Sequence, residues 1–360
     1  MERAERLISN AKRCDYIVLV NGSEPFLDST FWYVTEQRSG VFEGSIAIIS
    51  KDGTLDVITG SLEEVTAREG KGNIHVCNTR RKLNATLRKI LVRPKRIGMN
   101  TRFVSYSAVE YIKKITSAKI TDISKPLLET TSIKDPKEIE AIRKACEISS
   151  ESANAIPDLL KKGMSEKDMA SEIDMRMRRN GADGNAFDTI SAFGENAAKP
   201  HHTPTDRKLG DGDVALFDFG CKYERYCSDL TRTVFFKEPD VQLKRAYEVV
   251  AEAKAAGTAL IRDGVPAKDV DKAARKVIDE SEFKGLFIHS FGHAVGMNVH
   301  DGLTISYRSK EILRENMVIT AEPGIYIPGV GGIRIEDTVL VKKGGCESLT
   351  KFNQDYTVIR

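Results

Sequence analysis

The chain has 360 residues, of which 41% are hydrophobic and 30% are charged, and its formal net charge is +3. This length exceeds what one hydrophobic core usually serves, so we expect two domains. The small net charge gives no reason to expect a polyanionic partner, and no apolar run approaches the ~20 residues of a membrane helix. Six scattered cysteines without a CxxC pair, and an N-terminus without a secretory apolar segment, favour a cytoplasmic location.

The first 125 residues have the pattern of an α/β domain, with helical and strand-like segments in alternation. We expect helices at 3–13 and 82–91, and strands at 16–20, 31–35, 45–50, 55–59 and 96–99. The turn Lys51-Asp52-Gly53 predicts a hairpin between two of these strands. The only histidine here, His75, is interpreted as an exposed or satisfied residue rather than a ligand.

A basic stretch lies between Arg80 and Arg102, with nine basic residues and no acidic one. A nucleic-acid-binding patch is one interpretation, and an amphipathic helix is the other. The helix is favoured because Leu83, Leu87 and Ile90 recur at helical spacing and no aromatic residues are interleaved for base stacking. We therefore expect no nucleic-acid partner.

A domain boundary is predicted at Thr121–Pro136, where Pro126 and Pro136 bracket a polar stretch, with a second domain over residues 126–360. Helices are expected at 138–156, 165–179, 241–262 and 267–281, with β segments between and after them. Ser165 is the expected N-cap of the second helix. Each half of this domain then has a helix pair followed by a hairpin, which suggests a pseudo-twofold internal repeat.

Residues 214–236 are predicted to form a β-hairpin that carries two aspartates. A turn centred between Tyr223 and Glu224 would place Asp218 directly opposite Asp229. Like charges in such a pair repel, and each aspartate lies in an apolar run where a bare carboxylate is costly to bury. A cation between them would remove both penalties. The alternative is that Asp218 caps a turn and Asp229 is exposed.

A second predicted hairpin joins residues 318–326 and 332–341 around a Pro-Gly-Val-Gly turn. Glu322 and Glu336 then lie roughly opposite each other, although a proline and a glycine after Glu322 disturb the register. Asp337 alternates to the other face, so we leave it out of the candidate site. The alternative is a pair of solvent-facing glutamates.

Five of the six histidines lie between residues 201 and 300. In the segment HSFGHAVGMNVHDG, a spacing of four places His289 and His293 on one face of either a helix or a strand. It is not a zincin helix, because Ser290 stands where that motif has Glu. Gly292 and Gly296 indicate a close approach of the backbone to a site.

A Pro-His-His-Thr-Pro loop precedes the aspartate hairpin. Neighbouring side chains of an extended loop point to opposite sides, so at most one of His201 and His202 reaches a site, and His202 is expected at the surface.

Two carboxylate pairs and one histidine form an oxygen-rich ligand set for two divalent cations. Such ligands suit Mn²⁺, Co²⁺, Fe²⁺ or Zn²⁺. Two ions held about 3.5–4 Å apart would bridge and activate a water molecule and polarise a carbonyl oxygen.

The order of these residues, in the settings DFG, SDLTRT, HSFGHAVG, AEPGIY and GGIRIEDTVLV, resembles that of the prolidase and Xaa-Pro aminopeptidase family, metallopeptidase family M24. The resemblance spans roughly residues 125–360 and implies a pita-bread catalytic domain. The first 120 residues resemble the creatinase-type N-terminal domain of prolidases more loosely. The fold class is therefore α/β (α+β), with this N-terminal domain followed by the pita-bread domain.

This resemblance implies roles for individual residues. The two divalent ions, with Mn²⁺ or Co²⁺ favoured and Zn²⁺ or Fe²⁺ as alternatives, would be bound by Asp218, Asp229, His293, Glu322 and Glu336. Glu322 would also shuttle the proton. His201 and His300 would bind substrate or stabilise the transition state, and His289 and Arg334 would support the site.

The implied activity is hydrolysis of the Xaa-Pro bond of dipeptides or short peptides by a metal-bridged hydroxide, in a cytoplasmic homodimer without a membrane partner. Two departures leave dipeptidase and aminopeptidase open, with the dipeptidase favoured. Ser290 replaces a common glycine, and Thr304 lies where some relatives have an arginine for the dipeptide carboxylate. More distant alternatives are a methionine aminopeptidase, a creatinase-like amidinohydrolase and a non-catalytic binding module.

Overall fold

The computed structural model describes residues 2–352 and 357–359. They form two compact units, Met1–Thr131 and Ser132–Arg360. Helix α6 (Ser124–Ser132) ends at this boundary. Residues 126–131 fold with the first unit rather than the second, and Asn10 Nδ2 donates to Thr130 Oγ1 over 2.6 Å. No helix within the described ranges has the length and apolar character needed to cross a membrane.

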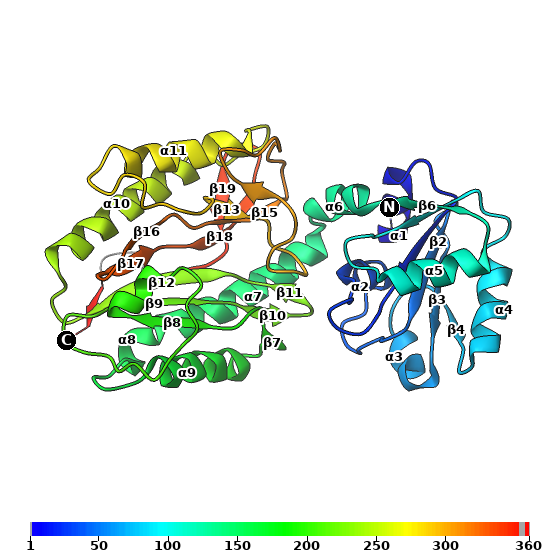
Figure 1. Ribbon diagram of the computed structural model, residues 1–360, viewed down its shortest axis with the longest axis horizontal. Helices are drawn as coiled ribbons and strands as arrows, with labels where there is room; N and C mark the ends of the chain where they lie inside the picture. Colours follow the sequence, from blue (N-terminus) through cyan, green and yellow to red (C-terminus); the bar gives the residue numbers. More distant parts are fainter. Residues whose placement is uncertain (1, 353–356, 360) are drawn as a thin grey trace. The chain divides into compact units, whose positions relative to one another are not determined.

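The first unit is built on a mixed six-stranded sheet with the order β4-β3-β2-β1-β5-β6 (Figure 1). Its strands are β1 (Tyr16–Val20), β2 (Ile46–Ser50), β3 (Leu55–Thr59), β4 (Asn73–Val76), β5 (Arg96–Met99) and β6 (Lys119–Asp122). Its helical segments, besides α6, are α1 (Arg3–Asn10), α2 (Ser29–Thr35), η1 (Ser61–Glu63), α3 (Glu64–Ala67), α4 (Arg80–Ile90) and α5 (Tyr106–Ile115). The predicted hairpin is β2–β3, in which Ile49 pairs with Leu55.

The strand expected at 31–35 is wrong, because these residues belong to helix α2. Asp28 is the N-cap of this helix, and its side chain accepts a hydrogen bond from the Thr30 N–H over 2.9 Å. The β-branched and aromatic composition of this segment favours a strand when it is read alone. Its helix is buried from Thr30 to Thr35, so packing in the core outweighs that local preference.

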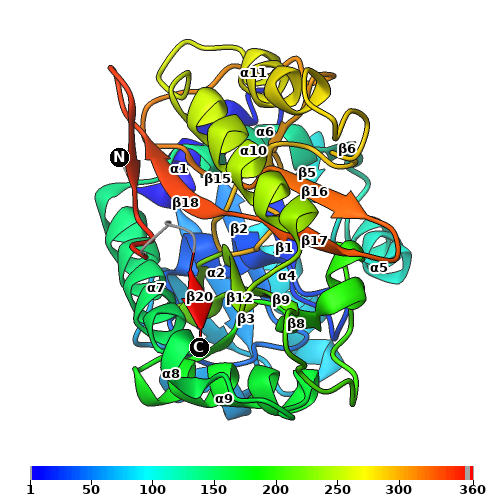
Figure 2. The same cartoon turned by 90° about the vertical axis from the view of Figure 1, so that its left-hand side faces the viewer.

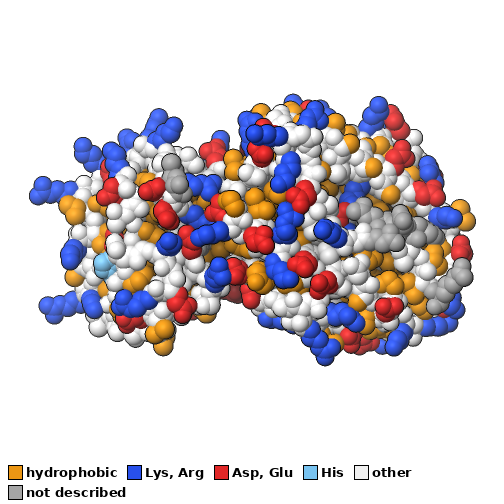
Figure 3. Space-filling model, turned by 180° about the vertical axis from the view of Figure 1, so that it is seen from behind, with side chains coloured by type: hydrophobic (Ala, Val, Ile, Leu, Met, Phe, Trp, Pro, Cys, Tyr) orange, Lys and Arg blue, Asp and Glu red, His pale blue; other side chains and the backbone are white. Residues whose placement is uncertain are grey.

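The basic stretch begins with helix α4, as the amphipathic interpretation predicted. Leu87 and Leu91 are buried in the core of the first unit, and Leu83 and Ile90 pack against that core. The basic side chains of the helix are left on its outer side. On the face of the molecule shown in Figure 3, Lys and Arg side chains are interspersed with Asp and Glu side chains.

The second unit has two helical layers, one on each side of its strands. Helices α7 (Pro136–Asn154), α8 (Ile156–Leu159) and α9 (Glu166–Arg179) cover one side, and α10 (Val241–Thr258) and α11 (Ala267–Asp279) cover the other (Figures 1 and 2). The expected cap at Ser165 is present, and Asp135 and Ser165 each form a capping box with the residue three positions later. The sequence predicted this arrangement, in which each half of the second domain contributes its own helices.

The strands between these helical layers form several short sheets. One has the order β20-β12-β9-β8, from β8 (Ile190–Phe193), β9 (Val214–Phe219), β12 (Leu230–Phe236) and β20 (Val358–Ile359). Another is β15-β18-β19, from β15 (Val318–Ala321), β18 (Asp337–Val341) and β19 (Cys346–Ser348). Smaller sheets join β7 (Gly184–Asn185), β10 (Cys221–Tyr223) and β11 (Tyr226–Cys227); β13 (Gly292–His293) and β14 (Thr304–Ile305); β16 (Gly324–Ile327) and β17 (Gly331–Arg334).

The register of the aspartate hairpin differs from the prediction by two residues. Asp218 pairs with Thr231 rather than with Asp229. The reason is the turn, which is centred between Glu224 and Arg225, one residue later than expected. Both residues have positive φ values, 46° and 72°, as the twist-matched type I′ turn requires. Asp218 and Asp229 therefore lie diagonally on one face of the hairpin, which still brings them to the same site.

Candidate active site

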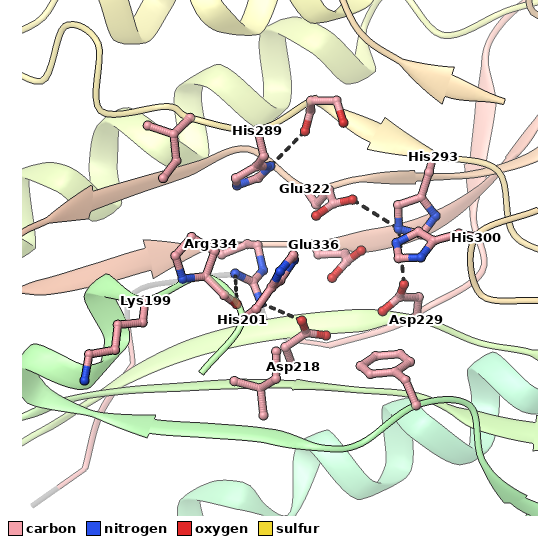
Figure 4. Close-up of a pocket in the computed structure, with 15 residues that line it drawn as sticks. Lys199, His201, Asp218, Asp229, His289, His293, His300, Glu322, Arg334 and Glu336 are labelled. Carbon is pink, nitrogen blue, oxygen red and sulfur yellow. Dashed lines mark hydrogen bonds and ion pairs between the residues drawn. The ribbon is translucent and has the colours of Figure 1, made fainter. Parts of the chain in front are cut away.

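All nine predicted site residues line one pocket of the second unit, with a volume of about 590 Å³ (Figure 4). They come from both halves of the unit: His201, Asp218 and Asp229 from the first, and His289, His293, His300, Glu322, Arg334 and Glu336 from the second. The site thus forms only when the two halves pack together.

The two aspartates each have a buried oxygen atom without a hydrogen-bond partner, namely Oδ1 of Asp218 and Oδ1 of Asp229. The other oxygen of Asp218 accepts a hydrogen bond from Arg334 Nη2 over 2.5 Å. A buried carboxylate oxygen without a donor is costly, and it needs either a proton or a cation. Both orphaned atoms belong to residues that line the same pocket, so the pocket is suited to bind a cation.

The two glutamates lie opposite each other across the second hairpin. The pairs β15–β18 and β16–β17 keep one register on both sides of a break in the strands, and this register places Glu322 opposite Glu336. Each carboxylate is held by a threonine. Thr231 Oγ1 donates to Glu336 Oε2 over 2.6 Å, and Thr320 Oγ1 donates to Glu322 Oε1 over 3.1 Å.

His293 completes the set of ligand types. Its Nε2 atom lies 3.5 Å from Asp229 Oδ2 and 3.3 Å from Glu322 Oε1. One ligand atom each from Asp229, His293 and Glu336 lies within 4.8 Å of the others. This is close enough for the three side chains to hold one ion together with small adjustments.

The carboxylates of this pocket repel one another strongly. Burial raises the pKa of Glu322 to about 8, with Arg334 opposing the rise and Asp218 adding to it. Burial also raises the pKa of Asp229 well above its usual range, and the charges of Glu336 and Asp218 add to that rise. The pKa of Glu336 is raised in the same way, by burial and then by Glu322 and Asp218. Four acidic groups in one buried pocket need compensating positive charge.

Divalent metal ions fit this pocket. The donor set is four carboxylates and one imidazole, two of the carboxylate oxygens have no partner, and the pKa values of Asp229, Glu322 and Glu336 are raised. Hard oxygen donors with a single nitrogen suit first-row divalent ions. Burial lowers the pKa of His293, which keeps its imidazole neutral and able to act as a ligand.

Arg334 lies at the centre of the hydrogen-bond network beside the carboxylates. Its Nε donates to Thr231 Oγ1 over 3.0 Å, and its Nη1 donates to the Tyr326 hydroxyl over 2.8 Å. That hydroxyl lies 2.8 Å from His289 Nε2, and His289 Nδ1 lies 2.9 Å from the Ser290 carbonyl oxygen. Burial, followed by the charge of Arg334, lowers the pKa of His289 to about 3. The neutral ring therefore donates from Nδ1 and accepts the Tyr326 hydroxyl proton at Nε2.

The remaining histidines are His300, which lies beside His293 in Figure 4, and His201, which lies beside Arg334. The ring of His300 packs edge-on against that of His293, with 4.2 Å between the ring centroids. Burial lowers the pKa of His300. His201 is exposed and lines the pocket on the side of Arg334.

The expectation that His202 lies at the surface is wrong. Its side chain is buried, and its Nε2 lies 2.8 Å from Glu166 Oε2. Glu166, at the start of α9, also accepts hydrogen bonds from the backbone N–H groups of Phe193 and Thr205, each over 2.9 Å. One carboxylate thus fixes both ends of the loop that carries His201. The prediction that only one of the adjacent histidines reaches the site agrees with this geometry.

The two glycines of the histidine segment are close to protein atoms rather than to the pocket. A Cβ at Gly292 would lie 2.2 Å from the Thr320 carbonyl oxygen. A Cβ at Gly296 would lie 2.0 Å from Asp301 Oδ2 and 2.9 Å from Lys134 Nζ. Both glycines therefore allow close packing of the segment that carries His293 and His300, which corrects the expected approach to the site itself.

Asp337 points away from the pocket, as the alternation of the strand predicted. Its carboxylate pairs with Arg232 Nη2 over 2.5 Å and with Lys254 Nζ. Sequence reasoning missed four residues that hold the site: Glu166, Thr231, Thr320 and Tyr326. It also missed residues that line the pocket, namely Phe187, Ile190, Lys199, Pro200, Ile288 and Ser290. Thr231 and Tyr326 lie inside the quoted motifs, so strand alternation from the neighbouring ligands was the available signal. Glu166 and Lys199 lie outside those motifs and carried none.

The fold and the donor set together define a divalent-metal hydrolase of the pita-bread type. The chain belongs to metallopeptidase family M24, whose model matches residues 140–343, and the model of the creatinase/prolidase N-terminal domain matches residues 3–130.

Among its relatives, the Xaa-Pro dipeptidase of Pyrococcus furiosus is 40% identical over 256 residues, which cover 70% of this chain and 73% of the relative. The Xaa-Pro dipeptidase of Pyrococcus horikoshii is 36% identical over 90% of this chain and 91% of its own. A crystal structure of an X-Pro aminopeptidase from Thermotoga maritima superposes with a TM-score of 0.92 at 34% identity, and covers 99% of this chain and 100% of its own.

Proposed function

We propose that the chain hydrolyses the peptide bond that precedes proline, and that it acts as an Xaa-Pro dipeptidase. The observation that carries this proposal is the convergence of four buried carboxylates and one histidine in a single pocket, with two carboxylate oxygens left without partners. The dipeptidases of two Pyrococcus species, at 40% and 36% identity, support the substrate class. The Thermotoga aminopeptidase keeps Xaa-Pro aminopeptidase as the second candidate.

In this proposal the metal ligands are Asp218, Asp229, His293, Glu322 and Glu336, and they hold two divalent ions, Mn²⁺ or Co²⁺ before Zn²⁺ or Fe²⁺. When bound, such ions lower the pKa of water and polarise the carbonyl group of the scissile bond. The chain's own contribution includes holding three of the five ligands, Glu336, Glu322 and Asp218, through Thr231, Thr320 and Arg334 respectively.

Glu322 is the proposed acid and base. Hydrolysis of an Xaa-Pro bond removes a proton from the attacking water and adds one to the proline nitrogen, because that nitrogen leaves as a secondary amine. A carboxylate in the pocket can make both transfers. Glu322 is buried, and its Oε1 is fixed by Thr320, so its second oxygen is the atom that takes and returns the proton.

The histidines and Arg334 are proposed to act on the substrate and on the ligands. His201 and His300 line the pocket from two sides and would donate hydrogen bonds to the substrate. Arg334 and His289 are linked through Tyr326, which fixes both side chains beside Asp218. We therefore assign Arg334 and His289 to support of the site rather than to proton transfer.

The test is hydrolysis of paired substrates by the full chain, first stripped of metal and then supplied with each divalent cation in turn. An Xaa-Pro dipeptide, an Xaa-Pro-Yaa tripeptide and a dipeptide without proline form the panel. The proposal expects cleavage of the proline dipeptide only when a cation is present. Preference for the tripeptide would favour the aminopeptidase, and failure to cleave either proline substrate with any cation would refute the assignment.

We further propose that the chain acts as a cytoplasmic homodimer, which is an expectation from family resemblance. All six cysteines are free thiols, which supports a reducing compartment. Light scattering on the purified protein tests the assembly, and a fully active monomer would contradict it.

A further inference from the structure

Arg232, Asp337 and Lys254 form a buried charge cluster, the rear cluster, next to the proposed metal ligand Glu336. Asp337 Oδ1 accepts a hydrogen bond from Arg232 Nη2 over 2.5 Å, and Asp337 Oδ2 pairs with Lys254 Nζ. The side chains of Arg232, Asp337 and Lys254 are only 2%, 3% and 8% exposed, and none of them lines the pocket of the metal ligands. Taking charges out of water costs about as much as their attraction returns, so a buried ion pair adds little net stability. Such a cluster can instead fix the geometry of the backbone around it.

The guanidinium of Arg232 joins strand β12 to the break between β17 and β18, where Glu336 lies. Its Nη1 donates to the Thr231 carbonyl oxygen over 2.8 Å and to the Glu336 carbonyl oxygen. The backbone N–H of Glu336 donates to the same Thr231 oxygen over 3.1 Å. Glu336 is therefore held to β12 through both of its backbone polar groups, in addition to the bond between its carboxylate and the Thr231 hydroxyl.

A second proposed ligand, Asp229, is held by the same part of the chain. Thr338 Oγ1 donates to the Asp229 carbonyl oxygen over 2.7 Å. The Thr338 N–H donates to Thr350 Oγ1 over 3.2 Å, and that hydroxyl in turn donates to the rear cluster over 2.7 Å. Asp229 and Glu336 are two of the three residues, with His293, whose ligand atoms lie within 4.8 Å of one another. The backbone positions of both carboxylate ligands in this group thus depend on contacts with the rear cluster and its neighbour Thr338.

We propose that the rear cluster positions Glu336 and Asp229 for metal binding, with Arg232 and Asp337 as positioning residues. This inference rests on the proposed function, because it concerns the proposed metal ligands. The Asp337 carboxylate orients the guanidinium so that Nη1 reaches the Glu336 carbonyl oxygen. Without that carboxylate, Arg232 loses its ion-pair partner and its fixed direction. Removing the outer partners of metal ligands typically lowers metal affinity by about 10- to 100-fold.

The experiment measures the Kd of the metal-free full chain for Co²⁺ by calorimetry, and the visible absorption spectrum of the Co²⁺-loaded protein. Asp337→Asn keeps the size of the side chain and removes its charge. It should weaken Co²⁺ binding by about tenfold or more and change the spectrum, because the spectrum reports the geometry of the ligands. Thr338→Val keeps the shape of the side chain and removes the hydroxyl that holds Asp229, so it should also weaken binding.

The matched control is Asp213→Asn, which breaks another carboxylate–arginine pair of the second unit. Arg207 donates to both oxygens of Asp213, over 2.8 and 3.0 Å, and neither residue lines the pocket. Urea unfolding of the metal-free proteins measures the stability that each substitution removes, and circular dichroism without urea shows which variants are folded. Asp213→Asn should lose stability and keep the wild-type Kd and spectrum, because a folded protein binds metal independently of its margin of stability.

The outcomes separate the two levels of inference. If wild type binds no divalent cation, the metal assignment of the proposed function fails, and this inference fails with it. If wild type binds Co²⁺ and Asp337→Asn keeps the same Kd and spectrum, the positioning role is refuted and the proposed function stands. If Asp337→Asn is unfolded, Thr338→Val decides, and a wild-type Kd in that variant refutes the role. An equal loss of affinity in Asp213→Asn would show that binding follows stability, which also refutes it.

Discussion

Arg334 Nη2 lies 2.5 Å from Asp218 Oδ2, and the same guanidinium reaches Glu336 through the Thr231 hydroxyl. Asp218 belongs to the first hairpin of the second unit and Glu336 to the second hairpin. One buried cation therefore ties together carboxylates from both halves of the domain. In the absence of metal, it is the positive charge closest to Asp218 among the interactions of the described residues.

Arg334→Met should destabilise the metal-free protein more than the metal-loaded protein. Removing one partner of a buried ion pair leaves an uncompensated charge, which costs about 3–5 kcal/mol. Bound cations would compensate Asp218 in the loaded protein, so the loss there should be smaller. Urea unfolding with and without a divalent cation measures both values. The exposed Arg179→Met is the control, and an equal loss in both states would contradict the prediction.

Chelation should abolish peptidase activity, and a divalent cation should restore it. The reason is the ligand set itself, in which five side chains converge and two carboxylate oxygens have no hydrogen-bond partner although Arg334 pairs with Asp218. Cations should also raise the free energy of unfolding, by about 2.7 kcal/mol at one hundred times Kd. Calorimetric unfolding and elemental analysis, made on the same samples, check both effects. Full activity in protein shown to contain no metal would overturn the dinuclear interpretation.

Much of the fold was predictable because caps and alternation are local signals. The start of α7 follows from Asp135 and Pro136, and the span of α9 follows from Ser165 and the Asn180-Gly181 pair. Helix α2 was not predictable in this way, since its apolar and β-branched residues favour a strand until their burial on all sides is known. The hairpin register was missed because the positive φ values of Glu224 and Arg225 have no glycine or asparagine to signal them.

The ligands of the site were predictable because acidic residues in apolar strands are anomalous by themselves. Asp218 and Asp229 stand out for that reason, whatever the register of their hairpin. The side chains that hold the ligands could not be found in the same way. Thr231 and Thr320 are ordinary strand residues, and Glu166 is an ordinary first-turn residue of a helix. Their roles depend on contacts between segments far apart in the chain.

Lys134→Met should destabilise the protein and impair the segment that carries His300. Lys134 Nζ donates to Asp301 Oδ2 over 2.9 Å, and the two side chains are only 1% and 11% exposed. Loss of the cation leaves the Asp301 carboxylate buried and unpaired, at a cost of about 3–5 kcal/mol. The temperature of thermal unfolding and kcat/KM should both be lower in Lys134→Met than in wild type. The exposed change Lys268→Met should alter neither value. Wild-type stability in Lys134→Met would show that this pair is dispensable.

Glu322→Gln should lower turnover by at least about 10², the scale of general acid–base catalysis. The amide keeps the size of the side chain and one oxygen donor for a cation, but it cannot exchange a proton. Metal content is measured alongside kcat to separate loss of chemistry from loss of binding. Glu311→Gln, an exposed change in the same unit, is the control. Normal turnover in Glu322→Gln with a full complement of metal would refute its role in proton transfer.

Glu166→Gln should reduce stability at neutral pH, and the difference from wild type should vanish in acid. Burial alone would raise the pKa of Glu166, but hydrogen bonds from Thr205, His202, Phe193 and Asn196 outweigh it and lower the pKa from 4.5 to about 2. At about 1.4 kcal/mol per pKa unit, this corresponds to roughly 3 kcal/mol of stabilisation.

The sign follows from the direction of the shift. A carboxylate whose pKa is lower in the folded state stabilises that state fully above its unfolded pKa, near 4.5, and loses the contribution as the pH falls toward 2. Free energies of unfolding in urea at pH 7, 4 and 3 should therefore show the wild-type advantage over Glu166→Gln shrinking stepwise. Glu311→Gln should show no comparable trend. If the difference in the free energy of unfolding stays constant from pH 7 to pH 3, the effect of Glu166 does not depend on the charge of its carboxylate. The packing of its side chain would then stabilise the loop that carries His201 and Lys199.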